Sequence, residues 1–109
     1  MTEDTHYKVL KILEQTPHIS QRELAREMGV SLGKVNYCLK ALVERGWVKM
    51  DNFSHNPHKL HYAYLLTPRG LKAKTTLTTS FLKRKLVEYE ALKAEIERLQ
   101  DDAESLAGD

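Results

Sequence analysis

The chain has one cysteine, three prolines and five glycines in 109 residues, and only 7% of its residues are aromatic. A single cysteine, Cys38, excludes an intramolecular disulfide and a zinc site built from several cysteines. No N-terminal apolar run resembles a signal peptide, and no stretch is long enough to span a bilayer. These absences predict a protein of the reducing cytoplasm that has no membrane partner.

The charges are distributed unevenly, although the net charge is only +2. Residues 1–70 hold ten basic and seven acidic side chains, residues 71–87 hold five basic and no acidic ones, and residues 88–109 hold two basic and eight acidic ones. A basic body therefore carries an acidic tail. Because nucleic acid repels acidic segments, we expect this tail to point away from any bound nucleic acid.

Two short helical patterns separated by a tight turn lie between residues 20 and 46. Ser20 to Glu23 reads Ser-x-x-Glu, the capping box that begins a helix, and Gly29 can adopt the left-handed conformation that ends one. Ser31 is a second N-cap. The apolar stripe of the second pattern, at helical spacing, consists of Val35, Cys38, Leu39 and Leu42. This arrangement is typical of a helix-turn-helix, whose second helix enters the major groove of DNA.

The flanking sequence adds one helix before this motif and two strands after it. A helix is expected from about residue 3 to residue 15, capped by Thr2, with Tyr7, Leu10 and Leu13 as its buried stripe. The β-prone residues 47–50 and the alternating residues 60–66 enclose a polar loop, which predicts a hairpin. In the second strand, one face is expected to hold Leu60, Tyr62, Tyr64 and Leu66. A hairpin directly after a recognition helix is the wing of a winged helix.

Thr67 and Pro68 fit the N-cap and the first position of another helix. No proline or glycine follows between Gly70 and Gly108, so this helix is expected to exceed thirty residues. Its first half is expected to pack through Leu71, Leu77, Phe81 and Leu86. Its second half carries a heptad seam, which extends back to Leu82 and comprises Tyr89, Leu92, Ile96, Leu99, Ala103 and Leu106.

The seam has no remaining segment of this chain to pack on, so a second copy is its simplest partner. In a parallel pair, Glu88 would face Lys93 of the partner, which is attractive. In an antiparallel pair like flanks would meet, but exposed ion pairs contribute only about 0–1 kcal/mol. The orientation is therefore left open.

These patterns predict a mostly α-helical protein with a small β-hairpin. Residues 1–67 would form a winged helix-turn-helix DNA-binding domain, and residues 68–109 a long C-terminal dimerisation helix that forms a coiled coil.

The outward face of the recognition helix offers groups that suit DNA. Asn36 can pair bidentately with adenine, Lys34 can reach guanine or phosphate, and Tyr37 can contact a thymine methyl group or a phosphate. The alternative is an ordinary solvated helix face. The predicted DNA-binding residues are Ser20, Gln21, Arg22, Ser31, Gly33, Lys34, Asn36, Tyr37, Lys40, His55, His58 and Lys59.

Four other features have simpler interpretations than a reactive site. The wing histidines at 55, 58 and 61 alternate faces on an extended chain, so DNA contact is favoured over a metal site, and no cofactor is predicted. Cys38 is expected to be a small core hydrophobe rather than a redox sensor, and Trp47 a core side chain. The basic run Lys83-Arg84-Lys85 is either a solvated face or a contact for DNA flanks. No catalytic constellation is present, so an enzyme is not expected.

Two stretches of the chain are similar to a known family. The segments HKLHYAYLLTPRG and FLKRKLVEYEALKAEIERL, which follow the helix-turn-helix GVSLGKVNYCLKALVERGWV, resemble the MarR-type winged-helix transcriptional regulators. They are most similar to a short subgroup associated with exopolysaccharide gene clusters, with the signatures NKLxYAYLLTPKG and FLKRKxxEYEALKAEIExL. The resemblance implies a dimeric DNA-binding regulator of envelope-polysaccharide genes, and it does not identify an effector.

The sequence therefore predicts a homodimer that binds a pseudo-palindromic operator in double-stranded DNA. Two alternatives remain, namely a winged helix that binds protein and a DNA-binding architectural protein that is indifferent to sequence.

Overall fold

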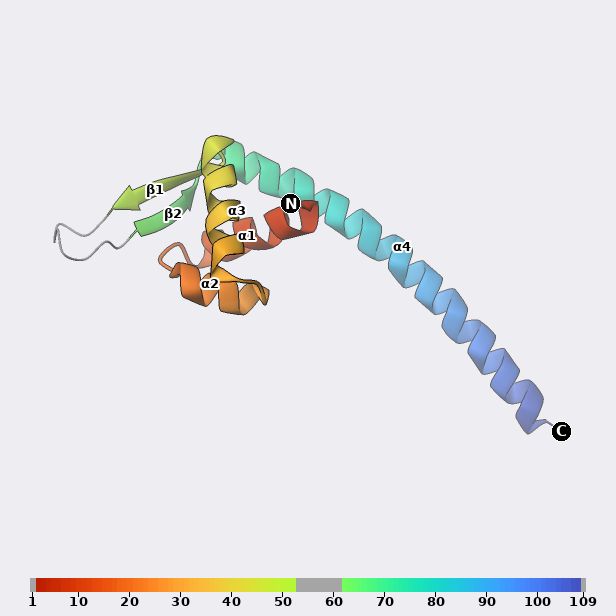
Figure 1. The fold of residues 1–109 in the computed structure, drawn as a ribbon. Coiled ribbons are helices and arrows are strands. Elements are labelled where there is room, and N and C mark those ends of the chain that lie inside the picture. Colours follow the sequence, from red (N-terminus) through yellow and green to blue (C-terminus); the bar gives the residue numbers. More distant parts are fainter. Residues whose placement is uncertain (1, 53–61, 109) are drawn as a thin grey trace. The chain divides into compact units, whose positions relative to one another are not determined.

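The computed structural model describes residues 2–52 and 62–108. In chain order it contains α1 (Glu3–Gln15), α2 (Gln21–Met28), α3 (Leu32–Glu44), β1 (Val48–Asn52), β2 (Tyr62–Leu66) and α4 (Pro68–Ala107) (Figure 1). Three helices, a two-stranded hairpin and a long helix follow one another as predicted, so the expected fold class is confirmed.

Hydroxyl side chains begin the first three helices. Each accepts a hydrogen bond from the backbone N–H three residues further on, which satisfies one of the free donors of the first turn. These capping residues are Thr2, Ser20 and Ser31. Gly29 ends α2 with a φ of +66°, and Gly46 follows α3 with a φ of +75°, both in the left-handed region that favours glycine. The boundaries of the helix-turn-helix are therefore those that the sequence predicts.

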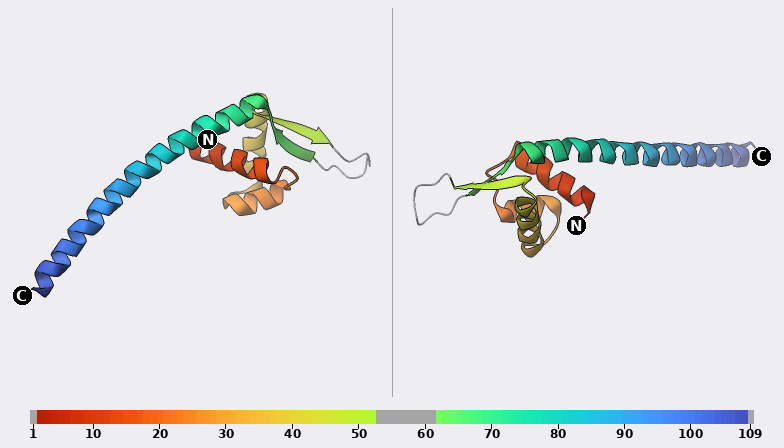
Figure 2. Two further views of the ribbon diagram at one scale, coloured as in Figure 1. Left: turned by 180° about the vertical axis from the view of Figure 1, so that it is seen from behind. Right: turned by 90° about the horizontal axis from the view of Figure 1, so that it is seen from above.

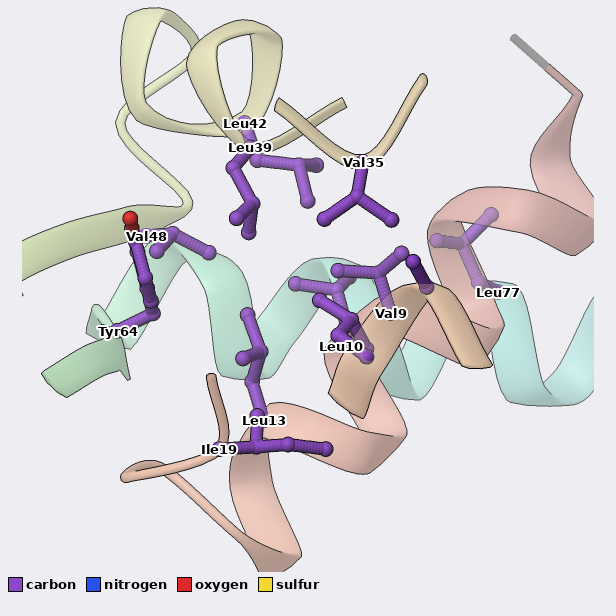
Figure 3. Packing of buried hydrophobic residues seen from close by; sticks show 12 residues of the cluster. Val9, Leu10, Leu13, Ile19, Val35, Leu39, Leu42, Val48, Tyr64 and Leu77 are labelled. Atoms are coloured by element: carbon purple, nitrogen blue, oxygen red, sulfur yellow. The ribbon is translucent and has the colours of Figure 1, made fainter. Parts of the chain in front are cut away.

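The residues up to Thr78 form one compact unit around a single apolar core (Figure 3). All six elements contribute to it, and Leu10 of α1 and Leu42 of α3 are fully buried. The core consists of Val9, Leu10, Leu13, Ile19, Leu24, Ala25, Val35, Leu39, Leu42, Val48, Tyr64 and Leu77. Tyr7, expected in the buried stripe of α1, is only partly buried and packs against this core.

The two strands pair antiparallel, beginning with Val48 opposite Leu66. In β2, Ala63 and Tyr64 are both buried, although they are neighbours in the strand. Neighbouring side chains of a strand point to opposite faces, so this part of β2 is covered on both sides. In addition, the backbone N–H of Tyr64 donates to the carbonyl oxygen of Pro17 at 3.1 Å, which ties the other edge of β2 to the loop before α2.

Thr67 begins α4 and anchors it. Its hydroxyl accepts a hydrogen bond from the backbone N–H of Gly70 and donates one to the carbonyl oxygen of Gly46. Pro68 occupies the first helical position, as predicted. A Cβ atom at Gly70 would collide with the backbone carbonyl group of Trp47. Only glycine fits at this close approach of α4 to the start of the hairpin.

α4 is one helix of 40 residues (Figure 2). The boundary between the two compact units, Met1–Thr78 and Thr79–Asp109, lies within it. Leu77 is buried in the core of the first unit, as expected. Leu71 and Leu86 were also expected to pack, but they are 46% and 53% exposed, so this expectation is wrong for the single chain. Among the residues that the structure describes, no helix combines the length and apolar character needed to cross a membrane.

Candidate nucleic-acid interface

α3 has two faces of opposite character. Its buried side chains are Val35, Cys38, Leu39 and Leu42, and they hold the helix against the core. The predicted outward positions are exposed, namely Leu32, Gly33, Lys34, Asn36, Tyr37 and Lys40. With 3.6 residues per turn, burial of the first set places the second set on the outside. All outward positions that the sequence predicts for this helix are therefore accessible.

The start of α3 presents its functional groups on consecutive turns. Ser31 caps the helix by accepting a hydrogen bond of 3.1 Å from the backbone N–H of Lys34. Gly33 has nothing within 4 Å of where a Cβ atom would lie, so the backbone is open at this point. Tyr37, one turn further on, is 68% exposed although it is a large aromatic residue. An exposed aromatic side chain beside a lysine and an amide is well suited to a groove of DNA.

The N-terminus of α2 adds a second group of predicted contacts. Ser20 and Arg22 are exposed, and the hydroxyl of Ser20 accepts a hydrogen bond of 3.1 Å from the backbone N–H of Glu23. Gln21 is only half-buried, and its Nε2 donates a hydrogen bond of 2.9 Å to the hydroxyl of Tyr64 on β2. Gln21 is thus held by the hairpin, which the sequence does not reveal.

A groove of about 270 Å³ runs between these elements. Its walls come from α2, α3 and both strands, and the lining residues are Gln21, Asn36, Leu39, Lys40, Val43, Glu44, Met50 and Tyr64. It brings Gln21 of α2 together with Asn36 and Lys40 of α3. Sequence reasoning missed Met50 and Tyr64 as parts of this site. The alternation of residues 60–66 marks Tyr64 as a strand residue but gives no sign of what it faces.

The wing residues His55, His58 and Lys59 lie outside the described residues, as do Leu60 and His61. Within residues 2–52 and 62–108, no group of three or more His, Cys, Asp or Glu residues could hold a metal ion.

Cys38 is 1% exposed, and burial raises the pKa of its thiol, although the charge of Lys34 acts in the opposite direction. A buried thiol of raised pKa is unreactive, so the prediction that Cys38 is a core residue is confirmed.

Three side chains form a cluster at the C-terminal end of α3. The ring of Trp47 packs against the core, as predicted, and the guanidinium group of Arg45 lies 5.2 Å from the centre of this ring. His6 of α1 meets the same indole edge-on, with ring centroids 5.9 Å apart, and is 5% exposed. Burial, followed by the nearby charge of Arg45, lowers the pKa of His6. The sequence does not predict that His6 is buried, because histidine is a polar residue and this position lies outside the apolar stripe expected for the helix.

The second unit, Thr79–Asp109, is described by itself as a helix with an exposed apolar stripe. Leu92 is 55% exposed and Leu99 is 60% exposed, and the other large residues of the predicted seam, Leu82, Tyr89, Ile96 and Leu106, are exposed as well. A shallow groove of about 260 Å³ lies on this face, lined by Tyr89, Leu92, Lys93, Ile96, Glu97 and Gln100. The stripe is uncovered in the single chain, as the sequence predicts.

Comparison with known proteins agrees with this geometry. Residues 2–49 match the family described as winged helix-turn-helix DNA-binding. A MarR/EmrR family transcriptional regulator from Acinetobacter sp. ADP1 is similar over 93% of this chain and 75% of its own, with a TM-score of 0.63 and 17% identity. The PcaV transcriptional regulator from Streptomyces coelicolor, in complex with its natural ligand, is similar over 94% of this chain and 77% of its own, with a TM-score of 0.68 and 22% identity.

A third similar structure is the S. aureus MepR–DNA complex, which covers 94% of this chain and 78% of MepR with a TM-score of 0.61 and 16% identity. No curated protein sequence matches the chain. At these identities the likeness concerns the fold. The predicted resemblance to MarR-type regulators is confirmed at this level, since the chain has the winged-helix fold that these regulators share.

Proposed function

Since the chain has the winged-helix fold of MarR-family transcription regulators, we propose that it is a sequence-specific DNA-binding regulator that acts as a homodimer. One observation carries the proposal. The turns of α3 that a major groove would receive expose an amide, two lysines and an aromatic ring, while the opposite face of the same helix is buried. The family match of residues 2–49 and the fold shared with MepR, which is solved with DNA, support it.

In this proposal α3 reads bases. Asn36 donates one hydrogen bond to adenine and accepts another from it. Lys34 and Lys40 reach guanine or phosphate, and Tyr37 contacts a thymine methyl group or a phosphate. Gly33 allows the backbone to approach the groove because no side chain stands there.

The register on the duplex would be set by contacts to phosphates. Ser20, Gln21 and Arg22 at the start of α2, and Ser31 at the start of α3, lie where free backbone N–H groups favour an anion. His55, His58 and Lys59 of the wing would contribute the remaining contacts to the phosphate backbone of the DNA.

Two copies would bind two half-sites of a pseudo-palindromic operator, about one helical turn of DNA apart. The exposed stripe of α4, from Leu82 to Leu106, is the surface proposed for dimerisation. Genes for exopolysaccharide or other envelope components are the proposed targets, because residues 58–70 and 81–99 resemble the subgroup associated with such clusters.

Footprinting on the DNA upstream of the protein's own gene tests the proposal. We expect protection of two half-sites. Random duplex should displace the operator from the protein only when it is present in large excess. Equal competition by random duplex would favour an architectural DNA-binding protein. Absence of any DNA binding at low salt would favour a protein-interaction module.

A further inference from the structure

The exposed apolar side chains of the first unit gather around the candidate interface. Among the described residues of Met1–Thr78, five large apolar side chains are exposed. Four of them belong to α3 or to the hairpin, namely Leu32, Tyr37, Met50 and Tyr62, and the fifth, Leu71, lies on α4. Single exposed apolar residues are ordinary on a protein surface, but a group of them beside a binding surface indicates what that surface contacts.

Leu32, the first residue of α3, is 42% exposed and is not one of the side chains that hold this helix to the core. Val35 and the buried residues after it do so, and Val30 packs against the core from the turn before. The free N–H groups of a first turn favour an acidic residue, and α1 has Glu3 and Asp4 there, but α3 has no acidic residue in its first turn. Neither packing nor helix electrostatics therefore explains a leucine at this position.

The neighbours of Leu32 suit a close approach to base pairs. The N-terminal residues of a recognition helix are those that contact base edges in the major groove. Gly33 has no side chain, and nothing lies within 4 Å of where its Cβ atom would be, so the backbone beside Leu32 is open. The absence of an acidic residue from this turn avoids repulsion of phosphates. Bound DNA would therefore cover the side chain of Leu32.

Thymine is the base whose edge in the major groove suits a leucine. It presents an apolar C5-methyl group there, whereas the edges of the other three bases consist of hydrogen-bonding groups. A leucine against one of those edges would leave a donor or an acceptor unpaired, which is unfavourable. Contact with the methyl group instead removes apolar surface from water, and one buried methyl group corresponds to about a fourfold gain in affinity.

Asn36 lies one helical turn after Leu32, and residues four apart share one side of a helix. Four residues of an α-helix rise about 6 Å, close to the height of two base steps of about 3.4 Å each. We propose that Leu32 reads the methyl group of a thymine that lies within about two base pairs of the adenine read by Asn36. This inference rests on DNA binding by α3 in the proposed function.

Replacement of thymine by uracil in the operator tests the inference, because uracil lacks only the methyl group. The probe is the duplex protected by footprinting upstream of the protein's own gene, with one thymine replaced at a time and at the same place in both half-sites. At one such thymine, the wild-type protein should lose about fourfold in affinity for each half-site. Leu32→Ala should bind the unmodified duplex more weakly and should not distinguish thymine from uracil at this position. Since Leu32 is exposed, the variant should keep the fold.

Leu71→Ala is the matched control, because Leu71 is also a leucine near the start of a helix of the first unit and is 46% exposed. It should keep the full loss of affinity on uracil replacement. Equal losses in Leu32→Ala and the wild type, or no loss at any thymine in the wild type, overturn the inference and leave specific DNA binding intact.

The position of the methyl-sensitive thymine gives a second test. It should lie within about two base pairs of the pair at which Asn36→Ala relaxes discrimination, and a larger separation overturns the proposed arrangement. A protein that binds the probe no better than random duplex removes the proposed function, and the inference with it.

Discussion

The side-chain amide of Gln21, at the first position of α2, donates a hydrogen bond of 2.9 Å to the hydroxyl of Tyr64 on β2, 43 residues away in the sequence. This bond joins the start of the helix-turn-helix to the hairpin across the groove that Asn36 and Lys40 also line. It fixes the side chain of a residue proposed to contact phosphate, and so it gives the proposed interface a defined shape.

We predict that Tyr64→Phe weakens DNA binding more than it weakens the fold. The ring stays in the core, and loss of one hydrogen bond lowers the free energy of unfolding by about 1 kcal/mol. Gln21 loses its anchor, so operator affinity should fall by up to about tenfold, or about 1.4 kcal/mol. Tyr62→Phe, the same change two residues earlier on the more exposed part of β2, is the control. Equal operator affinity for the two variants would show that the bond has no role in positioning Gln21.

Gly70→Ala should strongly destabilise the protein, because the new Cβ atom meets the backbone carbonyl group of Trp47. Backbone cannot move aside as a flexible side chain can, so we expect a loss of at least about 2 kcal/mol in urea unfolding. Gly33→Ala is the matched control in another helix, where the position is open. It should raise the free energy of unfolding by about 0.5–1 kcal/mol, the helix preference of alanine over glycine. A Gly70→Ala protein as stable as the wild type would disprove the close approach of α4 to the hairpin.

Stability should decline as the pH falls below about 6.5, the ordinary pKa of histidine. Burial and the charge of Arg45 lower the pKa of His6 in the folded protein, so the unfolded chain binds the proton first. The stabilisation is complete above the unfolded pKa and is lost as the pH falls through the window between the unfolded and the folded values.

Urea unfolding at pH 7.5 and pH 5.5 measures this loss. His6→Leu should reduce the difference between the two pH values, whereas His18→Leu, a change at an exposed position before α2, should leave most of it. The same pH dependence in the wild type and in His6→Leu would show that another group is responsible.

Leu92→Asp combined with Leu99→Asp should convert the protein into monomers with a folded winged helix. The two carboxylates would be buried in the seam of the proposed dimer, where an unpaired charge is costly. Affinity for an operator with two half-sites should collapse, because each half binds weakly alone. Ala91→Asp combined with Ala94→Asp adds the same charge outside the seam and should remain dimeric in sedimentation. A dimeric Leu92/Leu99 variant would place the interface elsewhere.

The fold could be predicted where its signals are local. Ser20, Gly29 and Ser31 mark the helix ends through contacts within three or four residues, and the buried stripe of α3 fixes which side chains face outward. The exposed positions of the candidate site follow from the same stripe. The contacts between Gln21 and Tyr64 and between Gly70 and Trp47 were not predictable, because they join segments far apart in the sequence.

The expectation for Leu71 and Leu86 failed for a related reason. Apolar residues at helical spacing show that a face is suited to burial, but spacing alone does not show whether the same chain covers it. Leu77 shares that pattern, and the core of the first unit buries it.

The most direct test of the account is a salt titration of operator binding by Asn36→Ala and Lys34→Ala, with Gln15→Ala and Lys11→Ala on α1 as matched exposed controls. All four variants should keep the free energy of unfolding within about 0.5 kcal/mol of the wild type. Asn36→Ala should lose about 1–3 kcal/mol of discrimination at one base pair. Lys34→Ala should weaken binding to all sequences and reduce the salt slope by about one unit. Wild-type affinity and wild-type salt slope for both α3 variants would contradict the claim that α3 reads DNA.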